Sequence, residues 1–277
     1  MAFTLHLSPD GTIERPALTP PPTDTHKYAR GHAMIVSGPA LRTGASRLSA
    51  EAALAVGAGL VTMIGDKAAL SEHAAHVTAI MLRERDAGLS GIDDRVRSLL
   101  IGPGAGVSDD LVQDVTTLLR RKIPVVLDAD ALTAFSAKPE MLFAMLHTQA
   151  VLTPHEGEFA RLFPGIALGD RAKAVLDAAK RAGAVVLLKG AKTVIAAPDG
   201  RIAINRHASP WLATAGSGDV LAGLICGLLA QGNEAFEAAA IACWLHGDIG
   251  VRAGPGLTAD AMVGHLALVL RDILRDA

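Results

Sequence analysis

The chain has 277 residues, and 26 Lys and Arg against 28 Asp and Glu give it a formal charge of −2. Half of the residues are apolar, which excludes a disordered chain, and the lack of a basic excess gives no electrostatic footprint for nucleic acid. Six Phe, two Trp and one Tyr are too few to build stacking platforms for single strands.

Cysteine usage and apolar runs indicate the compartment. Cys226 and Cys243 lie in apolar, helix-like stretches and predict buried, inert thiols rather than a disulfide framework. The first residues lack the basic start and apolar core of a secretory signal, and the apolar stretch 220–230 is too short to span a bilayer. We therefore expect a cytoplasmic protein.

The predicted elements follow an extended N-terminal lead-in, residues 1–25, in which prolines disfavour helix. Residues 26–277 contain no linker and predict a single domain. Apolar runs predict strands over 33–37, 60–64, 98–102, 124–128, 150–153, 184–189, 193–197 and 201–205. Amphipathic or apolar periodicity predicts helices over 44–58, 108–121, 168–182, 218–231, 233–252 and 257–275.

This alternation predicts an α/β fold with a mainly parallel sheet and helices on both of its faces. The last two strands, separated by Pro198-Asp199-Gly200, predict a hairpin. Ligands of such sheets bind beyond the carboxyl ends of the strands. We therefore looked for functional residues where each strand ends.

The strongest motif is ATAGSGD, residues 213–219, which runs directly into a predicted helix. Gly216, Ser217 and Gly218 can turn the backbone so that consecutive N–H groups form a phosphate-binding anion hole. Asp219, beside that site, suits a general base acting on a hydroxyl nucleophile. The alternative is a first-turn acid favoured by the helix dipole, and the flanking glycines favour the catalytic interpretation.

A second motif, LKGAKT, joins two predicted strands at residues 188–193. Lys189 and Lys192 could approach nucleotide phosphates, and Gly190 would allow close approach of a ligand. The spacing is not that of a Walker A loop, and a glycine turn with solvated lysines explains the motif equally well.

A third motif, TPHEGEFARLF, begins at Thr153. Thr153 is predicted as a helix N-cap, with Pro154 at the first helical position and Glu156 completing the cap. His155 then stands at the strand-to-helix corner, where it is either a ligand-binding group or a surface histidine.

Two further turns carry glycine or carboxylates. GPGAG at 102–106 resembles a dinucleotide fingerprint, but Val107 stands where Gly or Ala is needed, so a glycine-rich wall and a plain turn remain equal alternatives. Asp128 and Asp130 could contact a metal through water, although for Asp130 we favour a helix N-cap.

Taken in order, these motifs resemble those of the ADP-dependent NAD(P)H-hydrate dehydratases, a branch of the ribokinase-like superfamily. The resemblance runs from HKYARGH (26–32) to the last helix and includes TGA (43–45), GAGLVT (57–62), VVLDADAL (125–132) and WLHG (244–247). It implies a three-layer α/β/α ribokinase-like fold.

The resemblance also implies an activity. ADP would phosphorylate the C6 hydroxyl of (6S)-NADHX or (6S)-NADPHX, and loss of phosphate would restore NADH or NADPH and leave AMP. Asp219 would be the base, the N–H groups of Gly216 to Gly218 would hold the phosphoryl group, and Mg²⁺ would offset its charge.

Carried over position by position, the resemblance assigns two sets of residues. Ala45, Gly104, His155 and Asp219 match hydrate-binding positions. The residues that match AMP-binding positions are Lys189, Gly190, Ala191, Lys192, Thr193 and Gly218. Two departures lie beside them: Ala215 replaces a usual Gly, and Glu156 replaces a usual Pro.

The family further implies partners. Many relatives carry an N-terminal epimerase domain that the short lead-in cannot contain, so a separate epimerase is expected. A homo-oligomer, such as a tetramer, is also expected.

Other functions remain as alternatives. A ribokinase-like kinase of a small alcohol, such as hydroxymethylpyrimidine or hydroxyethylthiazole, would use the same GSGD chemistry. An NAD(P)-dependent oxidoreductase would use GPGAG and Asp128, and Val107 argues against it. A non-catalytic nucleotide-binding regulator would not need Asp219.

Overall fold

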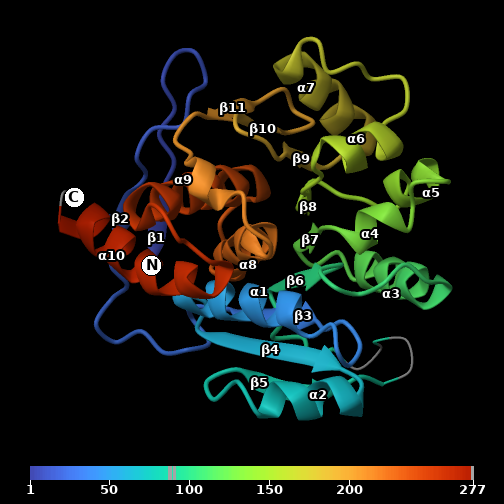
Figure 1. The fold of residues 1–277 in the computed structure, drawn as a ribbon, viewed down its shortest axis with the longest axis vertical. Helices are drawn as coiled ribbons and strands as arrows, with labels where there is room; N and C mark the ends of the chain where they lie inside the picture. The colour runs from blue at the N-terminus through green and yellow to red at the C-terminus, as the bar shows by residue number, and fades with distance from the viewer. Residues whose placement is uncertain (87–88, 90–91, 276–277) are drawn as a thin grey trace.

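A computed structural model describes residues 1–275 except 87–88 and 90–91. Its centre is a nine-stranded sheet in the order β11-β10-β9-β8-β7-β6-β3-β4-β5 (Figure 1). The strands of this sheet are β3 (His32–Val36), β4 (Leu60–Gly65), β5 (Met81–Glu84), β6 (Ser98–Ile101), β7 (Val125–Leu127), β8 (Ala150–Leu152), β9 (Val185–Leu188), β10 (Thr193–Ala196) and β11 (Ile202–Asn205). Every neighbouring pair from β5 to β9 is parallel, and the β9–β10 and β10–β11 pairs are antiparallel.

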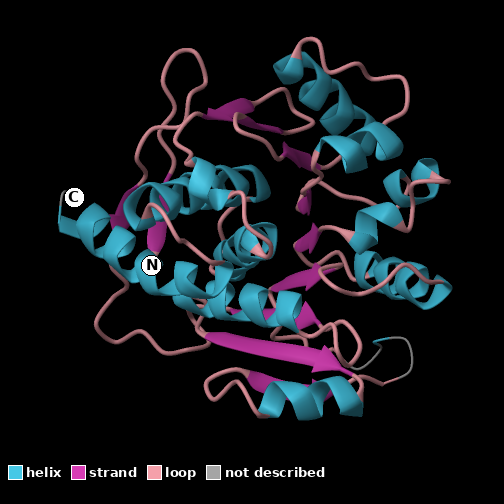
Figure 2. Ribbon diagram, viewed as in Figure 1, coloured by secondary structure: helices cyan, strands magenta, loops and turns pink. Residues whose placement is uncertain are grey.

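Helices cover both faces of this sheet (Figures 1 and 2). One layer contains α1 (Gly44–Ala55), α8 (Ser217–Ala230), α9 (Ala235–Ala253) and α10 (Ala259–Arg275). The opposite layer contains α3 (Asp109–Arg120), α4 (Asp130–Thr133), α5 (Pro139–Phe143), α6 (Glu156–Leu162) and α7 (Arg171–Ala182), while α2 (Lys67–Ala74) packs on β4 and β5. The predicted α/β class, parallel sheet and β10–β11 hairpin are confirmed.

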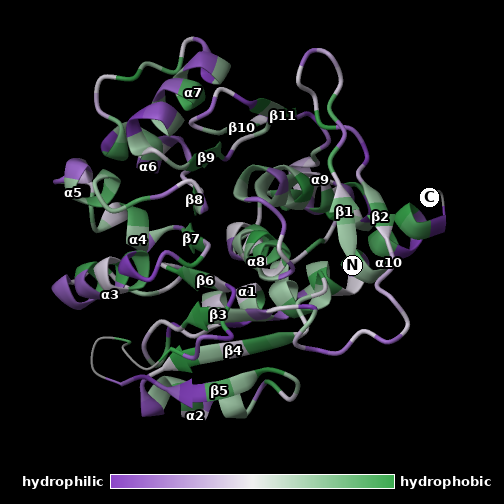
Figure 3. Ribbon diagram, turned by 180° about the vertical axis from the view of Figure 1, so that it is seen from behind, coloured by the Kyte–Doolittle hydropathy of each residue, from purple (hydrophilic) through white to green (hydrophobic). Residues whose placement is uncertain are grey.

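The core explains why the strand sequences are apolar throughout. Successive residues of a strand point to opposite faces, so Met34 and Val36 join the core beneath α3 to α7, while Ile35 joins the core beneath α1, α8 and α9. Helix α8 is enclosed in the same way: all of its residues from Val220 to Ala230 are buried, and Figure 3 shows it as hydrophobic along its length.

Glycines allow α8 to lie very close to α1. A Cβ atom on Gly223 would stand 2.2 Å from the carbonyl oxygen of Ser49, and one on Gly227 would stand 2.6 Å from that of Ala53. The two helices therefore touch backbone to backbone, which fixes the start of α8 against α1.

The lead-in is extended and contains two short strands, β1 (Ala2–Thr4) and β2 (Ala17–Thr19), which pair with each other. Between them the chain follows the free edge of β11. The N–H group of Ile13 donates to the oxygen of Ile204 at 2.9 Å, and the N–H group of Ile204 donates to the oxygen of Gly11 at 2.8 Å. The division into a lead-in and a single domain stays a prediction.

All eight predicted strands and all six predicted helices are present, with ends shifted by a few residues. The elements that the sequence did not predict are β1, β2, β5, α2 and α5, while α4 and α6 were indicated only by a predicted N-cap. Each is too short, or too exposed in the case of β5, to give a clear apolar period. The thiols of Cys226 and Cys243 are buried as predicted, and burial raises the pKa of each to about 12. Within the described residues, no helix is sufficiently long and apolar to cross a membrane.

Candidate active site

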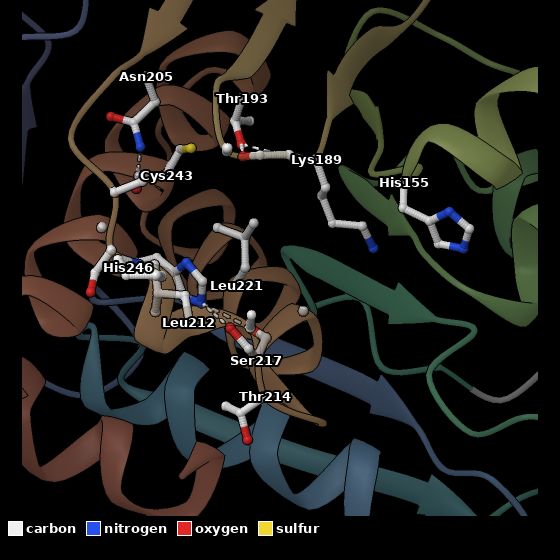
Figure 4. Close-up of a pocket in the computed structure, with 18 residues that line it drawn as sticks. His155, Lys189, Thr193, Asn205, Leu212, Thr214, Ser217, Leu221, Cys243 and His246 are labelled. Atoms are coloured by element: carbon white, nitrogen blue, oxygen red, sulfur yellow. Dashed lines mark hydrogen bonds between the residues drawn. The ribbon is translucent and has the colours of Figure 1, made fainter. Parts of the chain in front are cut away.

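A cavity of about 670 Å³ opens at the carboxyl edge of the sheet, beside β9, β10 and β11 (Figure 4). Its walls are the turn after β9, the segment 208–214, the start of α8 and the middle of α9. The sequence-predicted residues that line it are His155, Lys189, Gly190, Ala191, Thr193, Ser217 and Gly218. The structure thus brings together residues from three motifs, TPHEGEFARLF, LKGAKT and ATAGSGD, which are far apart in the chain.

Lys189 forms a largely buried ion pair with Asp128. Its Nζ lies 2.8 Å from Oδ1 of Asp128, which follows β7, and a Cβ atom on Gly218 would stand 3.6 Å from the same Nζ. Burial opposes the charge of Lys189, but the carboxylate of Asp128 outweighs it and raises the lysine pKa. A fixed positive charge therefore faces the first turn of α8.

The backbone beside this pair is strained. Ala129 has φ 49° and ψ −117°, a combination that costs an L-residue on the order of 1–3 kcal/mol and is typical of functional sites. The residues on the two sides of Ala129 have carboxylates with different partners. Asp128 faces Lys189, whereas Oδ2 of Asp130 accepts a hydrogen bond of 2.8 Å from the N–H group of Gly106. Asp130 is the first residue of α4 and Ala129 is its N-cap, so the predicted N-cap role of Asp130 is wrong.

Asp219 lies in the first turn of α8 and is half-buried. Burial and the nearby carboxylate of Asp128 raise its pKa to about 6, and the positive charge of Lys189 opposes the shift. A carboxylate with this pKa is largely ionised at neutral pH, yet it is a stronger base than an ordinary aspartate. Asp219 therefore combines ionisation at neutral pH with a raised basicity.

Gly216 shapes the loop before α8. It is the helix N-cap with φ 87°, and a Cβ atom there would stand 2.6 Å from Cδ1 of Leu48. The N–H group of Ser217 donates to the oxygen of Thr214 at 3.3 Å. The first N–H groups of a helix have no hydrogen-bond partners within it. The backbone N–H groups of Gly218 and Asp219, in the first turn of α8, are therefore available as donors.

His246, which the sequence did not assign to the site, holds this loop from α9. Its Nε2 lies 2.9 Å from the hydroxyl and 3.0 Å from the carbonyl oxygen of Ser217 (Figure 4). Burial lowers its pKa to about 4, so the ring is neutral at physiological pH. The WLHG motif was the available signal, and the fold shows that His246 contacts the GSGD loop.

His155 is itself the N-cap of α6, so the predicted cap at Thr153 is wrong. Nδ1 of His155 accepts hydrogen bonds from the N–H groups of Gly157 and Glu158, at 2.9 and 3.3 Å. In return, the backbone N–H group of His155 donates to Oε2 of Glu158 at 2.8 Å. Thr153 is buried instead, with its hydroxyl donating to the oxygen of Leu127. His155 contributes to the cavity wall, although its side chain remains 55% exposed.

Arg171 is a second residue that the sequence did not reveal. Its guanidinium donates to the carbonyl oxygen of Lys189 at 2.8 Å and pairs with Glu156 at 2.5 Å. A Cβ atom on Gly190 would stand 2.6 Å from the same guanidinium. Arg171 thus secures the turn after β9, and it neutralises the charge that Glu156 adds there.

Ala45 and Gly104 lie outside the cavity lining. A Cβ atom on Gly104, which has φ 68°, would stand 3.4 Å from Cβ of Ala45. The hydroxyl of Ser49 lies 3.0 Å from the oxygen of Ala45 and 2.9 Å from that of Asp219, and so connects α1 to the start of α8. Lys192 is exposed. Lys192, Gly216 and Asp219 are also outside the cavity lining.

The carboxylates at this edge fit a magnesium ion that arrives with a nucleotide. Among the described residues no three His, Cys, Asp or Glu side chains cluster as a preformed metal site. Mg²⁺ typically uses one or two carboxylates together with phosphate oxygens and water. Asp128, which faces Lys189 and lies near Asp219, is the residue that would hold it.

The sheet order, the glycine-rich helix start and the carboxylate beside it define a ribokinase-like α/β protein. Two solved structures with this fold match over most of the chain. An ADP/ATP-dependent NAD(P)H-hydrate dehydratase from Bacillus subtilis, co-crystallised with ATP and Mg²⁺, has a TM-score of 0.81 at 26% identity and covers 93% of this chain and 95% of its own. A ribokinase-like protein from Enterococcus faecalis has a TM-score of 0.82 at 26% identity, with 93% and 92% covered.

The chain belongs to the NAD(P)H-hydrate dehydratase family, whose model matches residues 33–274. A bifunctional NAD(P)H-hydrate repair enzyme from Synechocystis is 41% identical over 244 residues, which are 84% of this chain and 46% of that protein. One from Moorella thermoacetica is 39% identical over 269 residues, 90% of this chain and 51% of that protein. The chain spans about half the length of these relatives. A hydroxyethylthiazole kinase from Pyrococcus horikoshii, with a TM-score of 0.60 at 18% identity, shares the fold alone.

Proposed function

We propose that the protein dehydrates (6S)-NADHX and (6S)-NADPHX at the expense of a nucleoside phosphate, with ADP as the donor. The observation that carries the proposal is Asp219: a half-buried carboxylate with a pKa of about 6, at the N-terminus of α8 and next to the Lys189–Asp128 pair. Family membership supports the same reaction and favours it over the kinase and oxidoreductase alternatives.

The chemistry uses two steps. Asp219 takes the proton of the C6 hydroxyl while that oxygen attacks the terminal phosphorus of the donor, and AMP leaves when the donor is ADP. The ring nitrogen then expels phosphate from C6, and loss of a proton from C5 restores the dihydropyridine. Phosphorylation therefore turns a poor leaving group into a good one.

The donor and the hydrate contact separate sets of residues in this proposal. The residues for the donor are Lys189, Gly190, Ala191, Lys192, Thr193 and Gly218, of which all but Lys192 line the cavity. The residues for the hydrate are Ala45, Gly104 and His155. The N–H groups at the start of α8 stabilise the transferring phosphoryl group, and bound Mg²⁺ would offset its charge.

The test is the absorbance at 340 nm of purified protein with NADHX and Mg²⁺, with ADP, with ATP and without nucleotide. A rise that requires nucleotide, with AMP and phosphate formed in equal amounts from ADP, supports the proposal. A faster rise with ATP would identify ATP, and not ADP, as the preferred phosphoryl donor. No rise with verified 6S hydrate and folded protein would refute the dehydratase and direct the search to stable phosphate esters of small alcohols.

Two partner relations complete the proposal. An epimerase would supply the 6S hydrate from its 6R isomer, and adding one to a mixture of isomers should raise the final yield of NADH. The protein would also form a homo-oligomer, such as a tetramer, which light scattering after gel filtration can measure.

A further inference from the structure

The loop between β3 and α1 presents a leucine to solvent at a cost in backbone strain. Leu41 is 94% exposed and has φ 69°, a conformation that disfavours a residue with a Cβ atom. Its N–H group donates to both carboxylate oxygens of Glu72, at 2.9 and 3.1 Å, and the hydroxyl of Thr43 donates to the same carboxylate. These hydrogen bonds therefore hold the loop in a strained conformation, although the exposed side chain of Leu41 gains no stabilisation from packing.

Arg42, the next residue, brings a positive charge to the same place. Its side chain is exposed, and within the described residues its guanidinium has no acidic partner or hydrogen-bond acceptor. A Cβ atom on Gly106 would stand 3.2 Å from its Nη1, and one on Gly104 would stand 2.7 Å from its carbonyl oxygen. The guanidinium thus lies over the GPGAG loop.

The GPGAG loop adds a second exposed apolar side chain. Val107 is 58% exposed and directly follows Gly106. Because Gly104 also lies against Ala45, this surface adjoins the proposed hydrate site, whereas the lining of the 670 Å³ cavity includes five of the proposed donor residues and neither Ala45 nor Gly104. Leu41, Arg42 and Val107 together form a surface that we call the rim.

A hydrated dinucleotide is larger than its reacting ring. Once the ring lies beside Ala45 and Asp219, the rest of the molecule must extend past the edge of the sheet. That remainder contains phosphates, which a guanidinium binds through paired N–H donors, and a purine with apolar faces. The rim matches both parts, because it has the guanidinium of Arg42 for a phosphate and the side chains of Leu41 and Val107 for the purine.

We propose that the rim binds the adenosine phosphate half of the hydrated dinucleotide, with Arg42 on a phosphate and Leu41 and Val107 against the purine. This subsite rests on the proposed function. It predicts that the enzyme recognises its substrate partly through atoms far from the reaction, and that hydrates lacking that half are poor substrates.

The experiment compares NADHX with the hydrate of reduced nicotinamide mononucleotide, which lacks the adenosine half, at saturating nucleotide. In the wild-type protein kcat/KM should favour NADHX. Arg42→Ala should raise the KM for NADHX by roughly tenfold, as expected for loss of a charged hydrogen bond, while kcat and the KM for the nucleotide stay unchanged. With the truncated hydrate its KM should equal that of wild type, so the preference shrinks.

Two further variants keep the test clear of folding effects. Leu41→Gly relieves the strained φ, so its thermal midpoint should not fall, yet its KM for NADHX should rise several-fold. Arg120→Ala removes an exposed arginine from the far end of α3 and should behave as wild type.

The subsite is overturned if Arg42→Ala and Leu41→Gly keep both the KM for NADHX and the preference over the truncated hydrate. Failure of the proposed function gives a different result, because wild type would then turn over neither hydrate, and the rim would lose its assigned ligand with it.

Discussion

The ionised carboxylate of Asp219 should lower the free energy of unfolding of the protein at neutral pH. Its pKa in the folded protein is about 6, above the ordinary value of 3.8. A folded-state pKa above the unfolded one gives stability that is complete below pH 3.8 and is lost as the pH rises through about 6. The ionised carboxylate therefore destabilises the native protein at neutral pH, chiefly because burial removes it from water.

The substitution Asp219→Asn removes this charge with almost no change of shape. A shift of about two pKa units corresponds to at most about 3 kcal/mol. The variant should gain up to this free energy of unfolding at pH 8, and about half of it at pH 5, where the carboxylate is mostly protonated in the folded protein. Its turnover should fall by roughly 10²–10⁴-fold through loss of the general base.

Urea denaturation of both proteins at pH 5 and pH 8 measures the stability gap, and the 340 nm assay measures the turnover. A variant that is less stable than wild type at pH 8, or a gap that does not widen from pH 5 to pH 8, would refute the burial argument. Near-wild-type turnover would remove Asp219 from the mechanism whatever the stability shows.

Three further results are expected. The kcat/KM of the wild type should fall tenfold per pH unit below about pH 6, and a flat profile down to pH 5 would contradict the pKa of Asp219. Lys189→Met should move this acid limb to higher pH, because Lys189 holds the pKa of Asp219 down, and a downward shift would contradict it. Gly223→Ala should lower the free energy of unfolding in urea by about 2 kcal/mol or more, because its Cβ would overlap Ser49, whereas Gly264→Ala, with open space around it, should not destabilise; equal effects would refute the close helix contact.

The long elements could be predicted because their patterns repeat. Strands buried on both faces read as continuous apolar runs, and the stripe of α3 repeats over three turns. The short helices α4, α5 and α6 have no such repeating apolar pattern. At α6 the sequence pattern predicted a cap at Thr153. The fold buries that hydroxyl against Leu127 and leaves the imidazole of His155 to accept the helix N–H groups.

The motifs of the site could be found, but their pairings could not. The glycines before Asp219 indicated a phosphate-binding helix start from local sequence alone. The partner of Lys189 is 61 residues away, and His246 lies 29 residues from Ser217, so only the sheet order and the α8–α9 packing bring them together. Arg171 looked like any other surface residue of a helix.

The strap of chain at residues 11–13 has a consequence for solubility. It pairs with the outer edge of β11, where the N–H and C=O groups of Ile204 would otherwise be free to accept a strand from another molecule. Deleting the first fifteen residues would unmask that edge, together with the apolar surface that Phe3 and Ile13 cover. A shortened protein would therefore aggregate by strand addition, even though the residues around Asp219 are untouched.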